Sequence, residues 1–286
     1  MSDVILDVQN LRVAFRQDGE TTHAVRGISF QVKKGETVAI VGESGSGKSV
    51  SALSTVQLLG DSAVMAGSIT YQGEEMVGAD DATLRRVRGN DISFIFQEPM
   101  TSLNPLHTIE KQLAESIELH QGLRGGAVRA RIIELLDRVG IHDAESRLAS
   151  YPHQLSGGQR RRVMIAMALA NGPALLIADE PTTALDVTIQ AQILDLLADL
   201  KRDAGMSMLF ITHDLTIVRK IADRVCVMKD GVIVEVGVTT DFFDHPQHPY
   251  TQTLLAAEAA GGPAPVAADA PVVLQTDHAR IWFPIQ

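Results

Sequence analysis

The sequence predicts an α/β fold, with an open sheet flanked by helices and an antiparallel β subdomain at one side. Short apolar runs typical of buried strands alternate with segments of helical periodicity. One run, residues 37–41, leads directly into the glycine-rich segment 42–49. Another, residues 175–178, ends in Asp179 and Glu180. A buried parallel strand delivers polar residues to its carboxyl end in this way.

The first part of the chain supplies most of the expected strands. A helix is expected from Ser49 to about Leu59, because a glycine loop of this kind connects a strand to a helix. Strands are predicted wherever β-branched and aromatic runs are bounded by turn residues, which occurs at residues 5–15, 25–32, 37–41, 67–73 and 91–96.

Helices dominate the middle of the chain. Apolar residues at three- and four-residue spacing predict helices at residues 109–121 and 128–139, within a helical subdomain inserted at about residues 98–158. Ser156 is a good N-cap for a helix that runs to about Ala170. The later expected elements are a strand at 175–178, a helix with apolar residues between 189 and 200, a strand at 206–212, and a hairpin of residues 225–228 and 232–236.

The composition limits the class of protein. The 286 residues are 45% apolar and carry a formal net charge of −10. This acidity argues against a protein that grips nucleic acid, because phosphate-backbone binding requires a basic surface. The sequence contains no recognisable signal peptide and no apolar stretch long enough to cross a bilayer, so we expect a soluble, cytoplasmic chain. The single cysteine, Cys226, is expected to be buried and unreactive.

The segment 42–49 fits the phosphate-loop pattern G-x-x-x-x-G-K-[ST]. Its glycines allow the backbone to curl so that its N–H groups surround phosphates. Lys48 is expected to reach the β- and γ-phosphates of ATP, and the Ser49 hydroxyl to ligate Mg²⁺. The expected nucleotide-binding residues of this region are Gly42, Glu43, Ser44, Gly45, Ser46, Gly47, Lys48, Ser49 and Val50.

The acidic pair suggests catalysis. Asp179 is expected to hold Mg²⁺ through its outer shell, and Glu180 to polarise the water that attacks the γ-phosphate. Alone, such a pair is more often an ordinary solvated strand end. The phosphate loop earlier in the chain favours the catalytic interpretation.

The pentapeptide at residues 155–159, Leu-Ser-Gly-Gly-Gln, resembles the signature of ABC-type ATPases. The resemblance covers nearly the whole chain and implies a P-loop NTPase (RecA-like) ABC nucleotide-binding domain that binds and hydrolyses ATP. It further implies that Gln97 contacts Mg²⁺ and the attacking water, and that His213 contacts the γ-phosphate. Asp186 would cross a dimer interface, in a segment that departs from the family pattern only by Thr183 in place of serine.

Phe15 resembles the aromatic residue that stacks on adenine in this family. A phenylalanine in a strand is more often a core residue, and both interpretations stay open.

The signature also implies that a second domain completes the site. In the family, Ser156, Gly157, Gly158 and Gln159 form a γ-phosphate cradle at a helix start, and this cradle serves the nucleotide bound by the opposite domain. One copy cannot close its own site, so a second ABC domain is the expected partner.

The end of the chain suggests where that second domain lies. Residues 261–271 are rich in Ala, Pro and Gly, which predicts a linker after a nucleotide-binding domain of residues 1–260. Residues 273–284 align with residues 5–16, with identities at Leu274, Arg280 and Phe283. Identities this few could arise by chance. Their position after a linker favours the first strand of a second ABC domain within residues 261–286.

Longer matches indicate the kind of ABC protein. Residues 98–106, 181–190 and 248–251 resemble ATPase subunits of peptide and nickel importers. The resemblance implies a peripheral ATPase at the cytoplasmic face of the inner membrane that powers uptake of peptides or peptide-like compounds. Its partners would be integral membrane permeases and, indirectly, a substrate-binding protein.

The alternative is a soluble ABC ATPase that acts on ribosomes or nucleic acid. The run Arg160-Arg161-Arg162 invites that interpretation. On a helix these side chains point in different directions, so a solvated helix face is the expected arrangement. The acidic charge and residues 98–106 favour the importer, and no nucleic-acid partner is expected.

Overall fold

The computed structural model describes residues 3–17, 19–97, 102–183, 185–259 and 277. The strands are β1 (Val4–Gln17), β2 (Glu20–Lys33), β3 (Thr37–Val41), β4 (Ala63–Tyr71), β5 (Glu74–Glu75), β6 (Ile92–Ile95), β7 (Leu175–Asp179), β8 (Ser207–Thr212), β9 (Arg224–Lys229) and β10 (Val232–Val238). The helices are α1 (Lys48–Ser54), α2 (Asp81–Val87), α4 (Ile109–Gln121), α5 (Gly126–Arg138), α6 (Ala144–Arg147), α7 (Gly157–Leu169), α8 (Val187–Ala204), α9 (Leu215–Ile221), α10 (Thr239–Phe242) and α11 (Pro249–Ala259), with a 3₁₀ turn at Pro152–Gln154.

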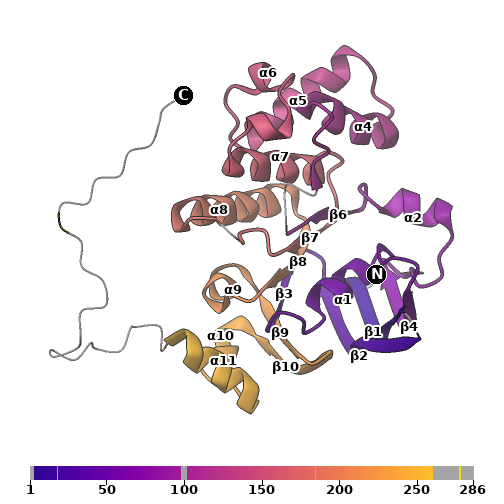
Figure 1. Cartoon of the computed structure of the whole chain (residues 1–286), viewed down its shortest axis with the longest axis vertical. Coiled ribbons are helices and arrows are strands. Elements are labelled where there is room, and N and C mark those ends of the chain that lie inside the picture. The colour runs from indigo at the N-terminus through magenta and orange to yellow at the C-terminus, as the bar shows by residue number, and fades with distance from the viewer. Residues whose placement is uncertain (1–2, 18, 98–101, 184, 260–276, 278–286) are drawn as a thin grey trace.

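Two sheets form the framework (Figure 1). The larger has the order β10-β9-β3-β8-β7-β6 and the smaller the order β2-β1-β4-β5. Strands β9, β3, β8, β7 and β6 run parallel, whereas β10 pairs antiparallel with β9 in the expected hairpin. All pairings in the smaller sheet are antiparallel. This arrangement confirms the predicted α/β fold with an antiparallel subdomain.

The parallel strands separate two cores, because successive side chains of a strand point to opposite faces. On β7, Leu175 and Ile177 pack in a cluster with Ala52 of α1 and with the antiparallel sheet. Leu176 and Ala178 pack in a different cluster, with α7 and α8. Every residue of β7 is buried, so the position of its carboxyl end is fixed by packing on both faces.

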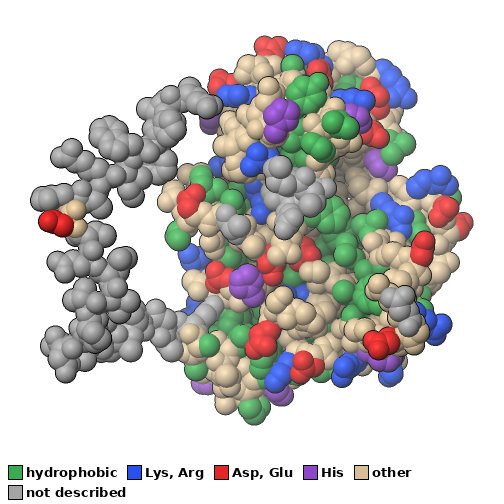
Figure 2. Space-filling view, in the orientation of Figure 1, with side chains coloured by type: hydrophobic (Ala, Val, Ile, Leu, Met, Phe, Trp, Pro, Cys, Tyr) green, Lys and Arg blue, Asp and Glu red, His purple; other side chains and the backbone are tan. Residues whose placement is uncertain are grey.

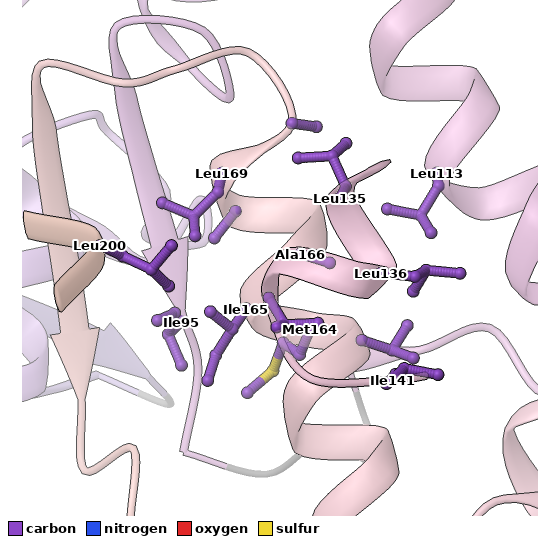
Figure 3. Close-up of a cluster of buried hydrophobic side chains, with 14 of the residues drawn as sticks. Ile95, Leu113, Leu135, Leu136, Ile141, Met164, Ile165, Ala166, Leu169 and Leu200 are labelled. Atoms are coloured by element: carbon purple, nitrogen blue, oxygen red, sulfur yellow. The ribbon is translucent and has the colours of Figure 1, made fainter. Parts of the chain in front are cut away.

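Helix α7 connects the inserted helices to the parallel sheet. Figure 3 shows the α7 side chains Met164 and Ile165 between Ile95 of β6 on one side and Leu136 of α5 on the other, all in one buried cluster. Packing therefore holds α7 between the parallel sheet and the inserted helices.

The helix after the phosphate loop is shorter than expected. It ends at Ser54 and not near Leu59. The carbonyl of Ala52 accepts from both the backbone N–H and the hydroxyl of Thr55, at 3.0 and 2.6 Å, so the last turn closes on Thr55 and the helix does not continue. Gln57 then adopts a φ of 50°, which an α-helix does not allow.

Helices α2, α9, α10 and α11 were not predicted from the sequence. Two of them are capped by an aspartate: Asp80 precedes α2 and accepts from the N–H of Thr83 at 2.8 Å, and Asp214 precedes α9 and accepts from the N–H of Thr216 at 2.8 Å. Each of these two helices has seven residues, too few for the apolar spacing to reveal it.

Several sequence-based expectations concern residues outside the described ranges. Apart from Asp277, the predicted linker and strand at residues 261–286 lie there, as do residues 98–101 of the importer-like segment.

Cys226 is buried, as expected: its side chain is 1% exposed, and burial raises the pKa of its thiol to about 12. Within the described ranges, no helix combines the length and apolar character needed to cross a membrane.

The phosphate loop is seated on β2 and on the β9–β10 hairpin. The N–H of Gly231 in the hairpin turn donates to the carbonyl of Ser46 at 3.1 Å. Gly47 has a φ of 100°, and a Cβ added there would lie 2.5 Å from the carbonyl oxygen of Ala24 on β2. Gly45 has a φ of 80°, and a Cβ added there would meet no other atom within 4 Å.

We expect Gly47→Ala to lower the free energy of unfolding more than Gly45→Ala does. Both positions have a positive φ, so each substitution costs about 1–2 kcal/mol of backbone strain. Only at Gly47 does the added methyl group also collide with a backbone carbonyl. Urea unfolding of the two variants measures the difference, and equal losses of stability would contradict this packing.

Candidate active site

Parallel pairing brings the sequence motifs to one edge of the large sheet. Val41 at the end of β3 pairs with Thr212 at the end of β8, and Ile211 of β8 pairs with Asp179 at the end of β7. The residues that follow these strand ends are the phosphate loop, His213 and Glu180. Their proximity is therefore a consequence of register, at the edge where α/β proteins place their ligands (Figure 1).

Lys48 is enclosed by the phosphate loop. Its side chain is buried, and its Nζ donates to the carbonyls of Gly42 and Glu43, each at 2.8 Å. Burial lowers the pKa of Lys48, and the negative charges of Glu180, Asp179 and Glu43 oppose this shift. The ammonium group thus lies between loop carbonyls and the acids at the end of β7, where added negative charge would stabilise it.

Asp179 and Ser49 fit a magnesium ion. The Ser49 hydroxyl lies close enough to the carboxylate of Asp179 to lower its pKa, and one carboxylate oxygen, Oδ1, is buried without a hydrogen-bond partner among the described residues. Burial and the charge of Glu180 raise the pKa of Asp179, against the lowering effects of Ser49 and Lys48. Mg²⁺ prefers oxygen ligands and commonly takes one or two from the protein, with phosphate and water completing the set.

Glu180 is the centre of a hydrogen-bond network. Its Oε2 accepts from the side-chain amide of Gln97 at 3.1 Å and from the hydroxyl of Thr183 at 2.8 Å. Its Oε1 lies 3.1 Å from Nδ1 of His213. The backbone of Glu180 has a φ of 45°, a conformation that costs a glutamate of order 1–3 kcal/mol. The surroundings therefore hold this carboxylate in a defined orientation.

The network keeps Glu180 ionised. Burial by itself raises the pKa of this carboxyl group. The hydrogen bonds from Thr183 and His213, together with the positive charges of His213 and Lys48, outweigh burial and bring the pKa below its ordinary value of 4.5. At neutral pH the group is a carboxylate that can accept a proton or orient a water molecule.

The structure brings together Gln97, Glu180, His213 and Asp179, all of which the sequence analysis selects. It adds Thr183, which the sequence marks only as a departure from the family pattern. The sequence feature that could have identified Thr183 is its hydroxyl, three residues after Glu180. A tight turn at that spacing brings the hydroxyl within reach of the Glu180 carboxylate. The N–H of Thr183 closes that turn on the carbonyl of Glu180 at 3.2 Å.

The signature residues cap a helix. Ser156 Oγ accepts from the N–H of Gln159 at 3.2 Å, and Gln159 Oε1 accepts from the N–H of Ser156 at 3.0 Å. This capping box fixes the start of α7, where Ser156 and Gly157 are exposed and Gly158 is half-buried. The exposed helix start is available to an outside partner, and its role toward a nucleotide stays a prediction.

Other selected residues also have local structural partners. Asp186 caps α8 by accepting from the N–H of Ile189 at 2.9 Å. Phe15 is half-buried in β1 and packs on the same core cluster as Val50 of α1. Of the remaining loop residues, Glu43 and Ser44 are exposed and Ser46 is buried. Adenine stacking by Phe15 and interdomain contact by Asp186 stay predictions.

The expected solvated face at Arg160-Arg161-Arg162 is wrong. Arg161 is 1% exposed and the other two are half-buried. The reason is that α7 lies between the sheet and the inserted helices, so most of its circumference is covered. All three guanidinium groups donate to backbone carbonyls: Arg160 to Pro152 and Leu155, Arg161 to Phe96, Gln97 and Thr183, and Arg162 to Val139.

Comparison with known proteins agrees with this geometry. Residues 25–183 match the ABC transporter family. The chain is 61% identical over 284 residues to the peptidoglycan transport ATP-binding protein YejF of Agrobacterium fabrum, covering 99% of this chain and 52% of that protein. It is 52% identical over 258 residues to a putative peptide import ATP-binding protein of Brucella ovis, covering 88% of this chain and 76% of that protein.

Solved structures give the same fold. A dimeric, post-hydrolysis form of the ATP-binding cassette MJ0796 bound to ADP and Pi superposes with a TM-score of 0.72 at 30% identity, covering 82% of this chain and 98% of that one. The chain spans about half the length of several curated relatives that it matches. On the strength of the family match, these identities and the shared fold, the chain belongs to the ABC transporter family and has the P-loop fold of its ATP-binding cassettes.

Proposed function

We propose that this chain is the ATP-binding and ATP-hydrolysing part of an importer of peptides or peptide-like compounds. The observation that supports it most is the convergence of Lys48, Asp179 and Glu180 at the carboxyl edge of one parallel sheet. Relatives named for peptidoglycan transport and peptide import support the class of cargo. Peripheral association with the cytoplasmic face of the inner membrane is part of the same proposal.

In this proposal each side chain has a defined task. Lys48 and the loop amides bind the β- and γ-phosphates, and Phe15 stacks on the adenine. Glu180 orients the attacking water, and Gln97 and His213 hold that carboxylate in place. Ser49, Asp179 and Gln97 would hold Mg²⁺, which when bound supplies positive charge against the phosphate oxygens.

A second ABC domain is the proposed partner for the signature. The start of α7 offers the N–H groups of Gly157 and Gly158, which the capping box does not use, to an anion outside this domain, and Asp186 lies at the exposed start of α8. The dimeric state of the similar ATP-binding cassette supports this pairing. We further propose that the nucleotide-binding domain spans residues 1–260, with its helical subdomain at about 98–158, and that residues 261–286 lead into a second copy.

A groove beside Gln97 is the proposed contact surface for a permease. It encloses about 210 Å³ and is lined by apolar side chains that include Leu58, Phe94, Phe96 and Met167. Leu58 is 41% and Phe96 38% exposed, which is unusual for large apolar residues that adjoin a core. The groove borders the segment that carries Gln97, so an element seated there would contact the backbone next to the Glu180 network.

The charge pattern supports an importer over a nucleic-acid ATPase. Figure 2 shows acidic and basic side chains interspersed over this face of the molecule, and the net charge is −10. Binding to a phosphate backbone would favour a continuous basic surface.

Glu180→Gln is expected to retain ATP binding and to lose turnover by a factor of about 10²–10⁴, because an amide cannot act as a base toward water. ATP hydrolysis and nucleotide retention measured on the same preparation separate the two effects. Glu110→Gln is the control, since it removes a surface carboxylate that pairs with Arg129 at 2.9 Å. Normal turnover by Glu180→Gln would remove Glu180 from the mechanism.

In the profile of ATP hydrolysis rate against pH, Thr183→Val is expected to move the fall in rate at low pH to a higher pH. The wild-type pKa of Glu180 lies below 4.5, so turnover is lost only as the pH falls through that low value. Removing the hydroxyl donor raises the pKa, and protonation then begins at a higher pH. Thr183→Ser retains the donor and is expected to keep the wild-type profile. Identical profiles for Val and Ser would show that this hydrogen bond does not tune Glu180.

The full-length protein is expected to copurify with integral membrane permeases from detergent extracts. Leu58→Glu should weaken that recovery by placing a charge in the apolar groove, whereas Leu119→Glu, at a residue of α4 that is 76% exposed, should not. Recovery with ribosomes or nucleic acid in place of permeases would favour the alternative ABC ATPase.

A further inference from the structure

Arg161 is a buried cation that binds neutral groups. It is 1% exposed, and among the residues that the structure describes no carboxylate lies within ion-pair distance of it. Burial lowers the pKa of its guanidinium to about 10, so the group remains charged at neutral pH. A buried charge without a counterion is costly, and here hydrogen bonds from the two terminal nitrogens offset that cost, while Nε has no hydrogen-bond partner among the described residues.

The hydrogen bonds of Arg161 join two segments that are distant in sequence. One terminal nitrogen donates to the carbonyl of Phe96 at 3.0 Å. The other donates to the carbonyl of Gln97 at 3.0 Å and to that of Thr183 at 3.3 Å. The planar fork of an arginine can bridge acceptors in this way, whereas a lysine ammonium is a single point of charge.

Both residues bridged by that second nitrogen contact Glu180 with their side chains. The Gln97 amide and the Thr183 hydroxyl donate to the same carboxylate oxygen, Oε2, at 3.1 and 2.8 Å. One guanidinium nitrogen therefore fixes two backbones whose side chains meet on one oxygen atom. Arg161 itself belongs to α7, the helix that starts with the signature capping box and packs against both the sheet and the inserted helices (Figure 3).

We propose that Arg161 is a positioning residue for ATP hydrolysis, which holds the Gln97 and Thr183 backbones against α7 so that both side chains reach the Glu180 carboxylate. This inference rests on the proposed hydrolytic function. Arg161 acts only through Gln97 and Thr183. It also gives a physical link between the signature helix and the group that orients water, because movement of α7 would carry the guanidinium with it.

The test compares Arg161→Met and Arg161→Lys with Arg162→Met in the full-length protein. Arg162 is a matched control on the same helix, since it donates to the Val139 carbonyl at 2.7 Å and to Gln192 at 3.1 Å, neither of which contacts Glu180. The measurements are kcat and the KM for magnesium-bound ATP.

Arg161→Met is expected to lower kcat at least about tenfold with little change in KM, the pattern of a lost transition-state contribution. Arg161→Lys should show a smaller loss of kcat, because it keeps the positive charge but loses the planar fork, and Arg162→Met should keep the wild-type kcat and KM. Should Arg161→Met fail to fold in a thermal unfolding measurement, Arg161→Lys carries the test.

An unchanged kcat in the folded Arg161 variants, or a loss of kcat in Arg162→Met equal to that in Arg161→Met, would overturn this role. A wild-type protein without turnover of magnesium-bound ATP would overturn the proposed function, which is a different and separable result.

Discussion

The parallel register of β3, β8 and β7 is the constraint on which the rest of the site depends. Each strand is buried on both faces, and the pairs Val41 with Thr212 and Asp179 with Ile211 align their carboxyl ends. A shift of one residue in any pair would turn every side chain of that strand to the opposite core. The packing that stabilises the sheet therefore also positions the phosphate loop, Glu180 and His213.

The charges at this edge oppose one another. Burial alone disfavours the charged forms of Lys48 and Asp179, as the directions of their pKa shifts show, while the hydrogen bonds to Glu180 keep it ionised. Phosphate oxygens would complement Lys48, and a divalent cation would complement Asp179. A low-dielectric site with a fixed carboxylate gains more from such partners than a solvated one would.

The α7 residues to which the proposals assign a function also stabilise the fold. Ser156 and Gln159 satisfy each other's backbone groups at the helix start, which leaves the helix tip exposed for an outside partner. One turn later, Arg161 points inward to the carbonyls around Glu180. Helix α7 packs between two hydrophobic surfaces, with the signature at its tip and a buried guanidinium in its first turns. In the proposed function this arrangement would couple the domain surface to the residues around Glu180.

The sequence by itself determined the fold class, the phosphate loop, the acidic pair and the capped signature helix, because each depends on local patterns: apolar period, glycine spacing and capping residues. Gln97 and His213 were indicated chiefly by the resemblance to ABC-type ATPases, and their position directly after predicted strands supported that assignment. Tertiary structure alone decided that Thr183 shares an oxygen of Glu180 with Gln97, and that Arg161 is buried and not solvated. Those facts depend on which segments meet in space. A run of three arginines has the same local pattern whether its helix faces water or lies between a sheet and a helical insert.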